Sequence, residues 1–393
     1  MRLFVLLSRF PYPLEKGDKL RAFHQIKELS KKHEIHLVCL SDQKVKDEWK
    51  KEVQQYCKSL NVFELKKGLL YWNTAKQFFT DKPFQVGYFY QKWIQRKINQ
   101  LIKDIDPDHI YCQLIRTAEY VKNNLNIGKT LDYQDALSKG LYRRAEIAKG
   151  IKKSVFLNEA KRLSEYENRI FDYFNHHTII SEQDKNLINH TNKEEIVIVE
   201  NGISDDFLNY EIKSEAIYEL IFVGNMNYPP NVECAEYLAT QVLPLLSENT
   251  KLGLIGASPN QRVLALAKHP NITVTGWVDD IKMAYASGKI FAAPLFIGTG
   301  LQNKLLEAMA IGIPSVTTRL ANNALHAKEG EEILLADDAE GFAEQINILL
   351  EDEQMQNKLA TQAKQFVKTH FNWASSVQKL SDLFESSLSE KRQ

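Results

Sequence analysis

Residues 290–310, IFAAPLFIGTGLQNKLLEAMA, decide the fold, because an apolar run, a glycine loop and a helical pattern follow one another without interruption. A similar arrangement lies upstream, where LIFVG at 220–224 ends in glycine before a helical pattern over 232–246. Short apolar runs that alternate with amphipathic helices are typical of parallel sheets, whose strands are buried on both faces. The sequence therefore predicts an α/β protein.

The same alternation extends over nearly the whole chain and divides into two series. In the first series we expect strands at 3–7, 35–40, 62–65, 109–112, 129–132, 178–180 and 196–199. In the second series we expect strands at 220–224, 252–256, 272–275, 290–296, 315–317 and 333–335. The polar stretch between the two series, residues 201–215, is the predicted linker. The predicted domains are residues 1–205, residues 206–372, and a C-terminal helical segment, 373–393, that packs back on the first domain.

The composition excludes several classes of protein. The 393 residues include 50 basic and 50 acidic side chains, and this balance argues against a nucleic-acid-binding protein. The four cysteines are far apart and lack zinc-ligand or CxxC spacing, so we expect neither a metal site nor a disulfide framework. No apolar run approaches the ~20 residues of a transmembrane helix. The apolar run at 3–7 is too short for a signal peptide, and we expect a cytoplasmic protein.

The glycine loop and the helix after it carry the most specific chemistry. Gly298 and Gly300 let a ligand approach the backbone closely, and a helix that starts near Leu301 directs free N–H groups and its dipole at an anion. Lys304 lies in the first turn, where the dipole disfavours a cation unless a phosphate is bound there. Glu307 shares a face with Lys304 and can accept hydrogen bonds from a ribose diol. The alternative is an intrahelical Lys304–Glu307 pair worth about 0.2–0.5 kcal/mol.

This segment, together with several others, resembles the GT-B glycosyltransferases, in particular the large retaining family that builds bacterial exopolysaccharides and lipid-linked glycans. The closest resemblance is to the exosortase-associated branch of sugar transferases. The resemblance covers most of the chain. The matching segments are FPYPLEKGDKLRAFHQIKEL at 10–29, DPDHIYCQ at 106–113, VENGIS at 199–204, FVGNMNYPPNVECAEYL at 222–238, GWVDDI at 276–281 and GTGLQNKLLEAMAIGIPSV at 298–316.

The resemblance implies a GT-B architecture of two doubly wound Rossmann-like domains with an interdomain cleft, in which the second domain binds the nucleotide-sugar donor. The donor-binding residues that it implies are Gly224, Asn225, Asn227, Val278, Gly298, Thr299, Gly300, Leu301, Gln302, Asn303, Lys304 and Glu307. The wider family carries two glutamates eight residues apart in this segment. Here Glu307 fills the second position and Thr299 stands in the first, so the contact of the first glutamate falls to backbone groups or to Thr299.

Polar residues follow several predicted strands of the first domain. Asp18 is the expected N-cap of a helix over 18–32, and Asp18, Arg21 and Gln25 share one side of that helix. This side indicates acceptor contacts or, alternatively, a solvated face. Asp135 follows the strand at 129–132, where it would orient an acceptor hydroxyl or cap a helix. The implied acceptor-binding residues are Gly17, Asp18, Arg21, Gln113 and Arg116, and the implied catalytic residues are Asp135, Lys304 and Glu307.

The predicted function is transfer of a sugar from a nucleotide-diphosphate sugar to a glycan or lipid-linked acceptor, as in polysaccharide biosynthesis. The resemblance implies retention of configuration. Lys304 and the helix N-terminus would stabilise the leaving diphosphate, so we expect no metal and no cofactor beyond the nucleotide sugar as co-substrate. Two other functions stay open: a nucleotide-sugar epimerase of the same fold, and a non-catalytic nucleotide-sugar-binding subunit.

Residues 71–93 are rich in aromatic side chains, and lysines at 66, 67, 76, 82 and 92 lie among or beside them. This combination suits peripheral contact with the inner face of the cytoplasmic membrane. The alternative is an ordinary domain core with lysines that extend to the solvent.

Overall fold

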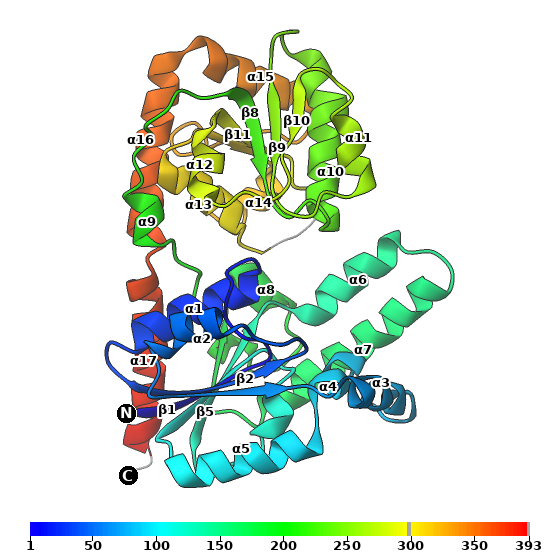
Figure 1. Ribbon diagram of the computed structural model, residues 1–393, viewed down its shortest axis with the longest axis vertical. Helices are drawn as coiled ribbons and strands as arrows, with labels where there is room; N and C mark the ends of the chain where they lie inside the picture. Colours follow the sequence, from blue (N-terminus) through cyan, green and yellow to red (C-terminus); the bar gives the residue numbers. More distant parts are fainter. Residues whose placement is uncertain (297–299, 391–393) are drawn as a thin grey trace. The chain divides into compact units, whose positions relative to one another are not determined.

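The computed structural model describes residues 1–296 and 300–390 (Figure 1). The chain forms two compact units, which we call unit 1 and unit 2. Unit 1 comprises Met1–Glu200 and Trp373–Gln393, and unit 2 comprises Asn201–Asn372. Each unit contains one parallel sheet whose strands are connected by helices.

The sheet of unit 1 has seven strands in the order β3-β2-β1-β4-β5-β6-β7, and every neighbouring pair is parallel. The strand β1 lies in the middle, and the run 3–7 within it is fully buried, as expected for a strand covered on both faces. The strands are β1 (Arg2–Leu7), β2 (Glu34–Ser41), β3 (Ser59–Glu64), β4 (His109–Gln113), β5 (Gly128–Gln134), β6 (His176–Ile179) and β7 (Val197–Ile198).

Helices connect these strands, and two of them, α6 (Leu137–Ile147) and α7 (Ile151–Phe171), pair as a hairpin that projects from the sheet (Figure 1). The other α-helices of unit 1 are α1 (Gly17–Leu29), α2 (Asp47–Gln54), α3 (Lys67–Lys76), α4 (Phe84–Phe89), α5 (Lys92–Ile105), α8 (Glu182–Leu187) and α17 (Trp373–Glu390). The 3₁₀ turns are η1 (Gln77–Phe79), η2 (Ala118–Tyr120) and η3 (Lys193–Glu195).

The C-terminal helix α17 packs along α1 within unit 1 (Figure 1). The Trp373 indole stacks on the His24 ring, with 5.0 Å between the ring centroids, and Phe384 is fully buried in the same core cluster. The end of the chain therefore completes the core of the unit that its beginning forms.

The sheet of unit 2 has six parallel strands in the order β10-β9-β8-β11-β12-β13. They are β8 (Tyr218–Val223), β9 (Leu252–Ile255), β10 (Ile272–Val274), β11 (Gly288–Ala293), β12 (Ser315–Thr317) and β13 (Leu334–Leu335). The α-helices are α9 (Asp205–Leu208), α10 (Pro229–Tyr237), α11 (Gln261–Leu266), α12 (Ile281–Ala286), α13 (Asn303–Ile311), α14 (Arg319–Asn322), α15 (Ala339–Glu351) and α16 (Glu353–His370). A π-helical turn, η4 (Leu238–Val242), and a 3₁₀ turn, η5 (Leu243–Leu245), follow α10.

The predicted α/β class and all thirteen predicted strands are confirmed. Two local predictions are corrected. The strand β11 ends at Ala293, before Pro294, because proline has no N–H to donate to a neighbouring strand. The stretch 201–215 is not a free linker, because Ile203, Phe207 and Leu208 are buried in the core of unit 2 and unit 2 begins at Asn201.

The four cysteines are free thiols, and three of them, Cys39, Cys112 and Cys234, are buried. No helix within residues 1–296 and 300–390 is long and apolar enough to cross a bilayer.

Candidate functional site

The first cluster of candidate residues lies at the carboxyl edge of the sheet of unit 2. The sheet runs outward in both directions from β8 and β11, which are adjacent although not consecutive in the chain. In open α/β sheets ligands bind at such a switch point, beyond the carboxyl ends of the strands. Gly224 directly follows β8, and residues 294–296 and 300–302 come between β11 and α13, so the described parts of both predicted donor segments lie at this point.

Two glycines bring the loops of this edge into close contact. A Cβ on Gly256, which follows β9 with a φ of +142°, would lie 1.9 Å from the Gly224 carbonyl oxygen. A Cβ on Gly224 would lie 2.7 Å from Nδ2 of Asn231. No larger residue fits at either position without displacing its neighbours, and backbone groups therefore line the edge.

Lys304 lies in the first turn of α13, and its ammonium is held inside this edge. Nζ donates to Oδ1 of Asn231 at 2.5 Å and lies 5.3 Å from the centre of the Phe222 ring. The Asn231 amide in turn donates to the Asn225 carbonyl oxygen at 2.9 Å, which connects Lys304 to the loop after β8. Burial lowers the pKa of Lys304. Within the described residues no carboxylate forms an ion pair with this ammonium, so it is available to an anion.

Glu307 lies one turn further along α13 and binds a different partner. Oε2 accepts a hydrogen bond of 2.7 Å from the Tyr285 hydroxyl, and no described residue donates to Oε1. Burial raises the pKa of Glu307 to about 7. The alternative of an intrahelical Lys304–Glu307 ion pair is not seen in the described part of the chain, because the two side chains bind Asn231 and Tyr285 instead.

The remaining donor residues form the rim of this edge. Asn225 and Asn227 are exposed, and Oδ1 of Asn225 accepts from the Asn227 backbone N–H at 3.0 Å. Val278 is half-buried against the core. Gln302 donates to the Gly300 carbonyl oxygen at 2.9 Å, and Asn303 accepts from Asn201 at 3.1 Å.

The helix of this segment begins at Asn303, two positions later than the predicted start near Leu301. Gln302 is its N-cap and makes no side-chain capping bond, and Leu301 lies in the loop before it, packed against the core. Lys304 remains in the first turn. Gly298 and Thr299 lie outside the described residues.

The acceptor-side residues lie at the corresponding edge of unit 1. The helix α1 begins at Gly17 and its N-cap is Lys16, so the prediction that Asp18 caps this helix is wrong. Asp18 is the second residue of the helix, and its carboxylate pairs with the Arg9 guanidinium at 2.6 Å. The pair fixes the loop after β1 onto the first turn of α1.

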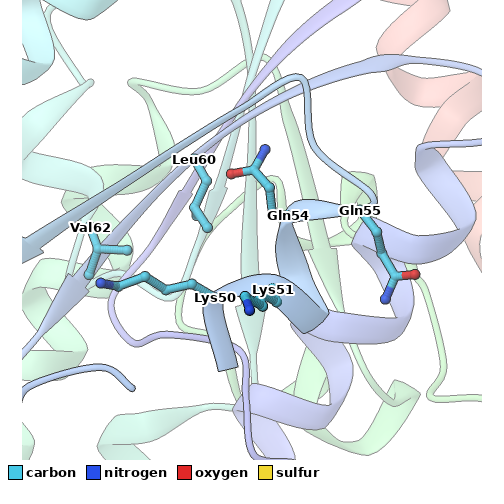
Figure 2. A pocket seen from close by; sticks show the side chains of 6 residues that line it. All are labelled: Lys50, Lys51, Gln54, Gln55, Leu60 and Val62. Atoms are coloured by element: carbon cyan, nitrogen blue, oxygen red, sulfur yellow. The ribbon is translucent and has the colours of Figure 1, made fainter. Parts of the chain in front are cut away.

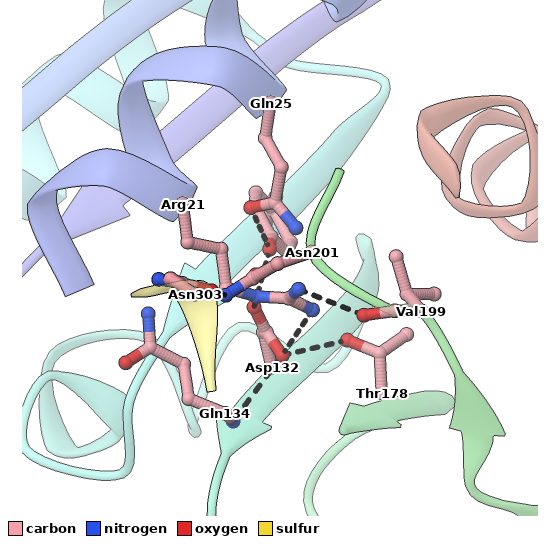
Figure 3. A network of polar contacts seen from close by, with 9 residues as sticks. Arg21, Gln25, Asp132, Gln134, Thr178, Val199, Asn201 and Asn303 are labelled. Atoms are coloured by element: carbon pink, nitrogen blue, oxygen red, sulfur yellow. Dashed lines mark hydrogen bonds and ion pairs between the residues drawn. The ribbon is translucent and has the colours of Figure 1, made fainter. Parts of the chain in front are cut away.

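Arg21 and Gln25 are fully buried and belong to a network of polar contacts (Figure 3), so the alternative of a solvated face at these residues is wrong. The Arg21 guanidinium forms two bonds to the Asp132 carboxylate, of 2.7 and 3.1 Å, and donates to the Val199 carbonyl oxygen at 2.7 Å. Asp132 also accepts from Tyr111, Thr178 and the Gln134 backbone N–H. A buried pair with this many bonds is costly to break from one side, and the network holds α1, β4, β5 and β6 in register.

Gln113 and Arg116 follow β4, next to β1 at the switch point of unit 1. Gln113 is buried, and its Nε2 has no hydrogen-bond partner among the described residues. Arg116 donates to Gln85 at 3.0 Å and stacks on the Phe89 ring. Burial, and then the neighbouring Arg9, lower the pKa of Arg116 to about 10. An unpaired buried amide is an expensive feature that a ligand would relieve.

Asp135 follows β5 in an exposed position. Desolvation by the protein groups around it, followed by the neighbouring Asp184 carboxylate, raises the pKa of Asp135 to about 6. The alternative role as a helix cap does not apply, because the N-cap of α6 is Ala136.

The surface of unit 1 includes two pockets of different size. The larger one, about 480 Å³, lies between α2 and the edge strand β3 and is lined by lysines and glutamines over an apolar floor of Leu60 and Val62 (Figure 2). The smaller one, about 160 Å³, lies where the β1–α1 and β2–α2 loops meet. Among the described residues there is no group of three or more His, Cys, Asp or Glu side chains placed to hold a metal ion.

Sequence reasoning missed the partners Asn231, Tyr285 and Arg9. Each binds a predicted site residue, but Asn231 is 73 residues from Lys304 and Tyr285 is 22 residues from Glu307. Local spacing does not reveal such pairs. The helical pattern was predicted over 232–246, whereas α10 begins at Pro229, so Asn231 lay outside the predicted helix.

Part of unit 2 matches a known protein family. Residues 218–352, from β8 to the end of α15, match the family Glycosyl transferases group 1. The matched segment contains Gly224, Lys304 and Glu307. A relative from Klebsiella pneumoniae, an uncharacterized 44.6 kDa protein in the cps region, is 22% identical over 94% of this chain and 96% of its own length.

Solved structures share the fold over the whole chain. The sucrose-phosphate synthase of Thermosynechococcus elongatus matches 99% of this chain and 100% of its own with a TM-score of 0.71 at 13% identity. Anabaena HepE, solved in complex with UDP-glucose, matches 98% of this chain and 99% of its own with a TM-score of 0.68 at 14% identity. At these identities the likeness shows the fold, which is the predicted GT-B architecture, and glycosyl transfer follows from the group 1 match.

Proposed function

We propose that this chain, a glycosyltransferase by its group 1 domain and its GT-B fold, moves a sugar from a nucleotide-diphosphate sugar bound by unit 2 to a glycan or lipid-linked acceptor bound by unit 1. One observation carries the donor assignment. The ammonium of Lys304 lies at a helix N-terminus, next to a glycine-lined edge, where it donates to the Asn231 amide oxygen and lies beside the Phe222 ring. A diphosphate supplies the charge that this position lacks.

In the proposed donor complex Lys304 and the N–H groups of α13 bind the diphosphate, and Glu307 binds the ribose through its free Oε1. Tyr285 holds the other oxygen of this carboxylate and so fixes its orientation. Gly224, Asn225, Asn227 and Val278 border the same edge, Val278 on the side of the base. HepE was solved with UDP-glucose, and UDP-sugars are therefore the first donors to test.

In the proposed reaction the bond between the sugar C1 and the phosphate oxygen breaks, and a bond forms between C1 and the acceptor oxygen. Negative charge grows on the leaving diphosphate, where Lys304 and the helix N-terminus stabilise it without a metal ion. The acceptor oxygen attacks C1 from the face that the diphosphate leaves, which retains the configuration, and its proton passes to the leaving phosphate oxygen, so no protein base is needed. Asp135, with a pKa of about 6 and therefore ionised at neutral pH, orients the acceptor hydroxyl.

On the acceptor side, Gln113 supports binding of a hydroxyl-bearing ligand. Its buried Nε2 donor has no partner within the described residues and lies at the switch point beside β1. A sugar hydroxyl would satisfy it. Arg116 and the Arg9–Asp18 pair are near neighbours that border the same region. Arg21 is buried and binds Asp132, so it positions this edge of the sheet without touching the ligand.

The test of the function is turnover. The full chain is incubated with UDP-glucose and related UDP-sugars, with and without glycan and lipid-linked acceptors and with EDTA, and products are identified by mass spectrometry and anomeric NMR. We expect acceptor-dependent transfer that survives EDTA and retains configuration. Release of a free epimerised sugar without an acceptor would identify an epimerase, and tight UDP binding with no turnover would identify a binding subunit.

We also propose peripheral contact with anionic lipid through α3 and η1. Within 71–93 the structure separates two groups of aromatics: Phe89 is buried, whereas Trp72 and Phe79 are 70% and 91% exposed. Lys66, Lys67 and Lys76 are exposed on the same segment. Exposed aromatic side chains beside lysines match the chemistry of an anionic bilayer surface.

Flotation with phosphatidylglycerol vesicles at low and high salt tests this contact. We expect the chain to float at low salt, and Trp72→Ala/Phe79→Ala and Lys66→Glu/Lys67→Glu/Lys76→Glu to abolish flotation. The matched control is Lys268→Glu/Lys358→Glu/Lys368→Glu in unit 2, which makes the same change of charge at exposed positions away from this segment. Wild-type protein that stays soluble at low salt would refute the contact without affecting the assignment of the donor site.

A further inference from the structure

Asn231 is the residue that fixes the Lys304 ammonium at the edge of the sheet of unit 2. It lies in the first turn of α10, directly after Pro229 and Pro230, and it is 4% exposed. Proline at the first positions of a helix has the backbone angle that the helix needs and no N–H to satisfy. The start of α10, and with it the Asn231 side chain, is therefore held in one place.

The two ends of the Asn231 amide bind different partners. Oδ1 accepts from the Lys304 ammonium at 2.5 Å, and Nδ2 donates to the Asn225 carbonyl oxygen at 2.9 Å. An ammonium can only donate and a carbonyl oxygen can only accept, so these two partners determine which way round the amide lies. A Cβ on Gly224 would lie 2.7 Å from Nδ2, and this position therefore has to stay glycine for the amide to fit.

The chemistry of the amide matters because it is neutral. A carboxylate of the same shape would also accept from the ammonium, but it would cancel the positive charge and repel the Asn225 carbonyl oxygen. An aliphatic side chain would bind neither partner and would leave both buried groups unsatisfied. Of these three kinds of side chain, only the amide satisfies both neighbours and leaves the charge of Lys304 intact.

The other groups near Lys304 do not replace this contact. The Phe222 ring lies 5.3 Å from Nζ and gives no directional bond. Burial raises the pKa of the Cys234 thiol to about 12, so this neighbour is neutral. Oε2 of Glu307 binds Tyr285 at 2.7 Å. Among the described residues, Asn231 is therefore the one side chain that accepts a hydrogen bond from the Lys304 ammonium.

We propose that Asn231 is a positioning residue for donor binding: its neutral amide holds the Lys304 ammonium at the carboxyl edge of the sheet and leaves its charge for the donor diphosphate. Asn231 acts through Lys304 and does not itself contact the donor. This inference rests on the proposed function, since it names the residue that prepares Lys304 for the diphosphate.

UDP and uridine together separate a positioning role from a merely structural one. Both ligands contain the base and the ribose, but only UDP contains the diphosphate that Lys304 is proposed to bind. A substitution that loosened the edge of the sheet would weaken both ligands alike. A substitution that acts through Lys304 would weaken UDP and leave uridine unchanged. The quantity to measure is therefore the ratio of UDP affinity to uridine affinity.

The first variant is Asn231→Asp in the full chain, with UDP binding measured by calorimetry and uridine binding by ligand-observed NMR. We expect the ratio of the two affinities to fall at least roughly tenfold, because the new carboxylate neutralises Lys304. The matched control is Asn249→Asp, which makes the same change of charge at an exposed position before β9, at the opposite end of the strands. The control should keep the wild-type ratio.

The second variant is Asn231→Ala, which removes the contact without adding a charge and keeps the test valid if Asn231→Asp fails to fold. We expect it to lower the ratio roughly threefold, as for the loss of one hydrogen bond that orients the ammonium. In a Lys304→Met chain the same substitution should lower the ratio no further, because two residues that act as one unit are not additive.

The outcomes distinguish this inference from the donor assignment. A wild-type ratio in both Asn231 variants would overturn the positioning role and leave the assignment of Lys304 intact. An equal effect of Asn231→Ala with and without Lys304 would also overturn the role, since the residue would then act independently of the lysine. If UDP does not bind to the wild-type chain, the donor assignment is itself contradicted, and this inference falls with it.

Discussion

The two sheets share a strand order around their central strands, yet they treat a buried cation in opposite ways. In unit 1 the Arg21 guanidinium pairs with a buried carboxylate, Asp132, which also accepts from Tyr111, Thr178 and the Gln134 backbone N–H. In unit 2 the Lys304 ammonium meets an amide and no ion-paired carboxylate in the described residues. The first arrangement is complete without a ligand. The second lacks a negative charge, and this lack is what a donor diphosphate would supply.

The largest expected effect on stability comes from breaking the buried Arg21–Asp132 pair of unit 1. Arg21→Met leaves Asp132 buried and charged without its partner, and it should destabilise unit 1 by about 3–5 kcal/mol. Asp132→Asn in the same chain should recover part of this loss, since the amide carries no charge. Urea unfolding followed by tryptophan fluorescence is the measurement, because Trp49, Trp72, Trp93 and Trp373 all lie in unit 1. If Arg21→Met unfolds at the same urea concentration as wild type, the network contributes nothing to the stability of unit 1.

The second prediction is that removal of the buried Lys304 charge, unlike removal of the Arg21 charge, does not lower the stability of the free protein. Burial lowers the pKa of Lys304, so the folded state disfavours its charged form and the ammonium costs stability at neutral pH. Lys304→Met should therefore melt no lower than wild type in the absence of ligand. The same variant should lose about 1.5–3 kcal/mol of UDP affinity, because the diphosphate loses a charged partner. Lys268→Met, at an exposed position of unit 2, is the control and should change neither quantity.

The third prediction concerns the pH dependence of stability that the titration of Glu307 produces. Its pKa is about 7 in the folded chain against an ordinary value of 4.5, so the folded state binds the extra proton between these values. Stability contributed by this group is therefore lost as pH rises from about 4.5 to about 7. The melting temperature of Glu307→Gln should fall less over this range than that of wild type. Identical pH profiles for the two proteins would contradict the burial of a titrating carboxylate.

The same titration should appear in donor binding. The ionised Glu307 accepts hydrogen bonds from the ribose better than the protonated acid, so UDP affinity should rise as pH passes through about 7. Because the nucleotide phosphates also titrate, the comparison is with Glu307→Gln, in which the part due to Glu307 is absent. A difference between the two proteins that stays constant from pH 6 to pH 8 would refute the role of the carboxylate.

The smallest expected effect on stability is that of an exposed ion pair, which serves as the reference for the buried pairs. Arg262 and Glu236 form an ion pair on the surface of unit 2, with side chains 63% and 28% exposed. Arg262→Ala should shift the melting temperature by an amount too small to resolve, because exposed pairs gain little over their hydration. A shift comparable to that of Arg21→Met would mean that burial does not account for the difference between the pairs.

The sheets could be predicted from the sequence, and the polar pairs could not. All thirteen strands follow from apolar runs whose length and spacing are local properties of the chain. The burial of Arg21 depends on its ion pair with Asp132, which is 111 residues away in the sequence. The helical spacing of Arg21 alone fitted a solvated face equally well. Lys304 was recognised because its conflict with the helix dipole is local. Its partner Asn231 was not, because that contact exists only after two strands have become neighbours.

Helix starts were also predicted imperfectly, for a related reason. Asp18 is a good capping residue by type, but its carboxylate binds Arg9, and the helix begins one residue earlier at Gly17. A capping preference is a weak local term that a nearby ion pair outweighs. The start of α13 at Asn303 instead of near Leu301 likewise reflects the packing of Leu301 against the core.

The central claim is that unit 2 binds a nucleotide-diphosphate sugar through Lys304. Isothermal titration calorimetry of the full chain with UDP tests it most directly, with Lys304→Met and Lys268→Met measured beside wild type. The claim predicts saturable binding to wild type and to Lys268→Met, and affinity at least roughly tenfold weaker for Lys304→Met. Equal affinity in all three proteins, or no binding of UDP to wild type, would contradict it.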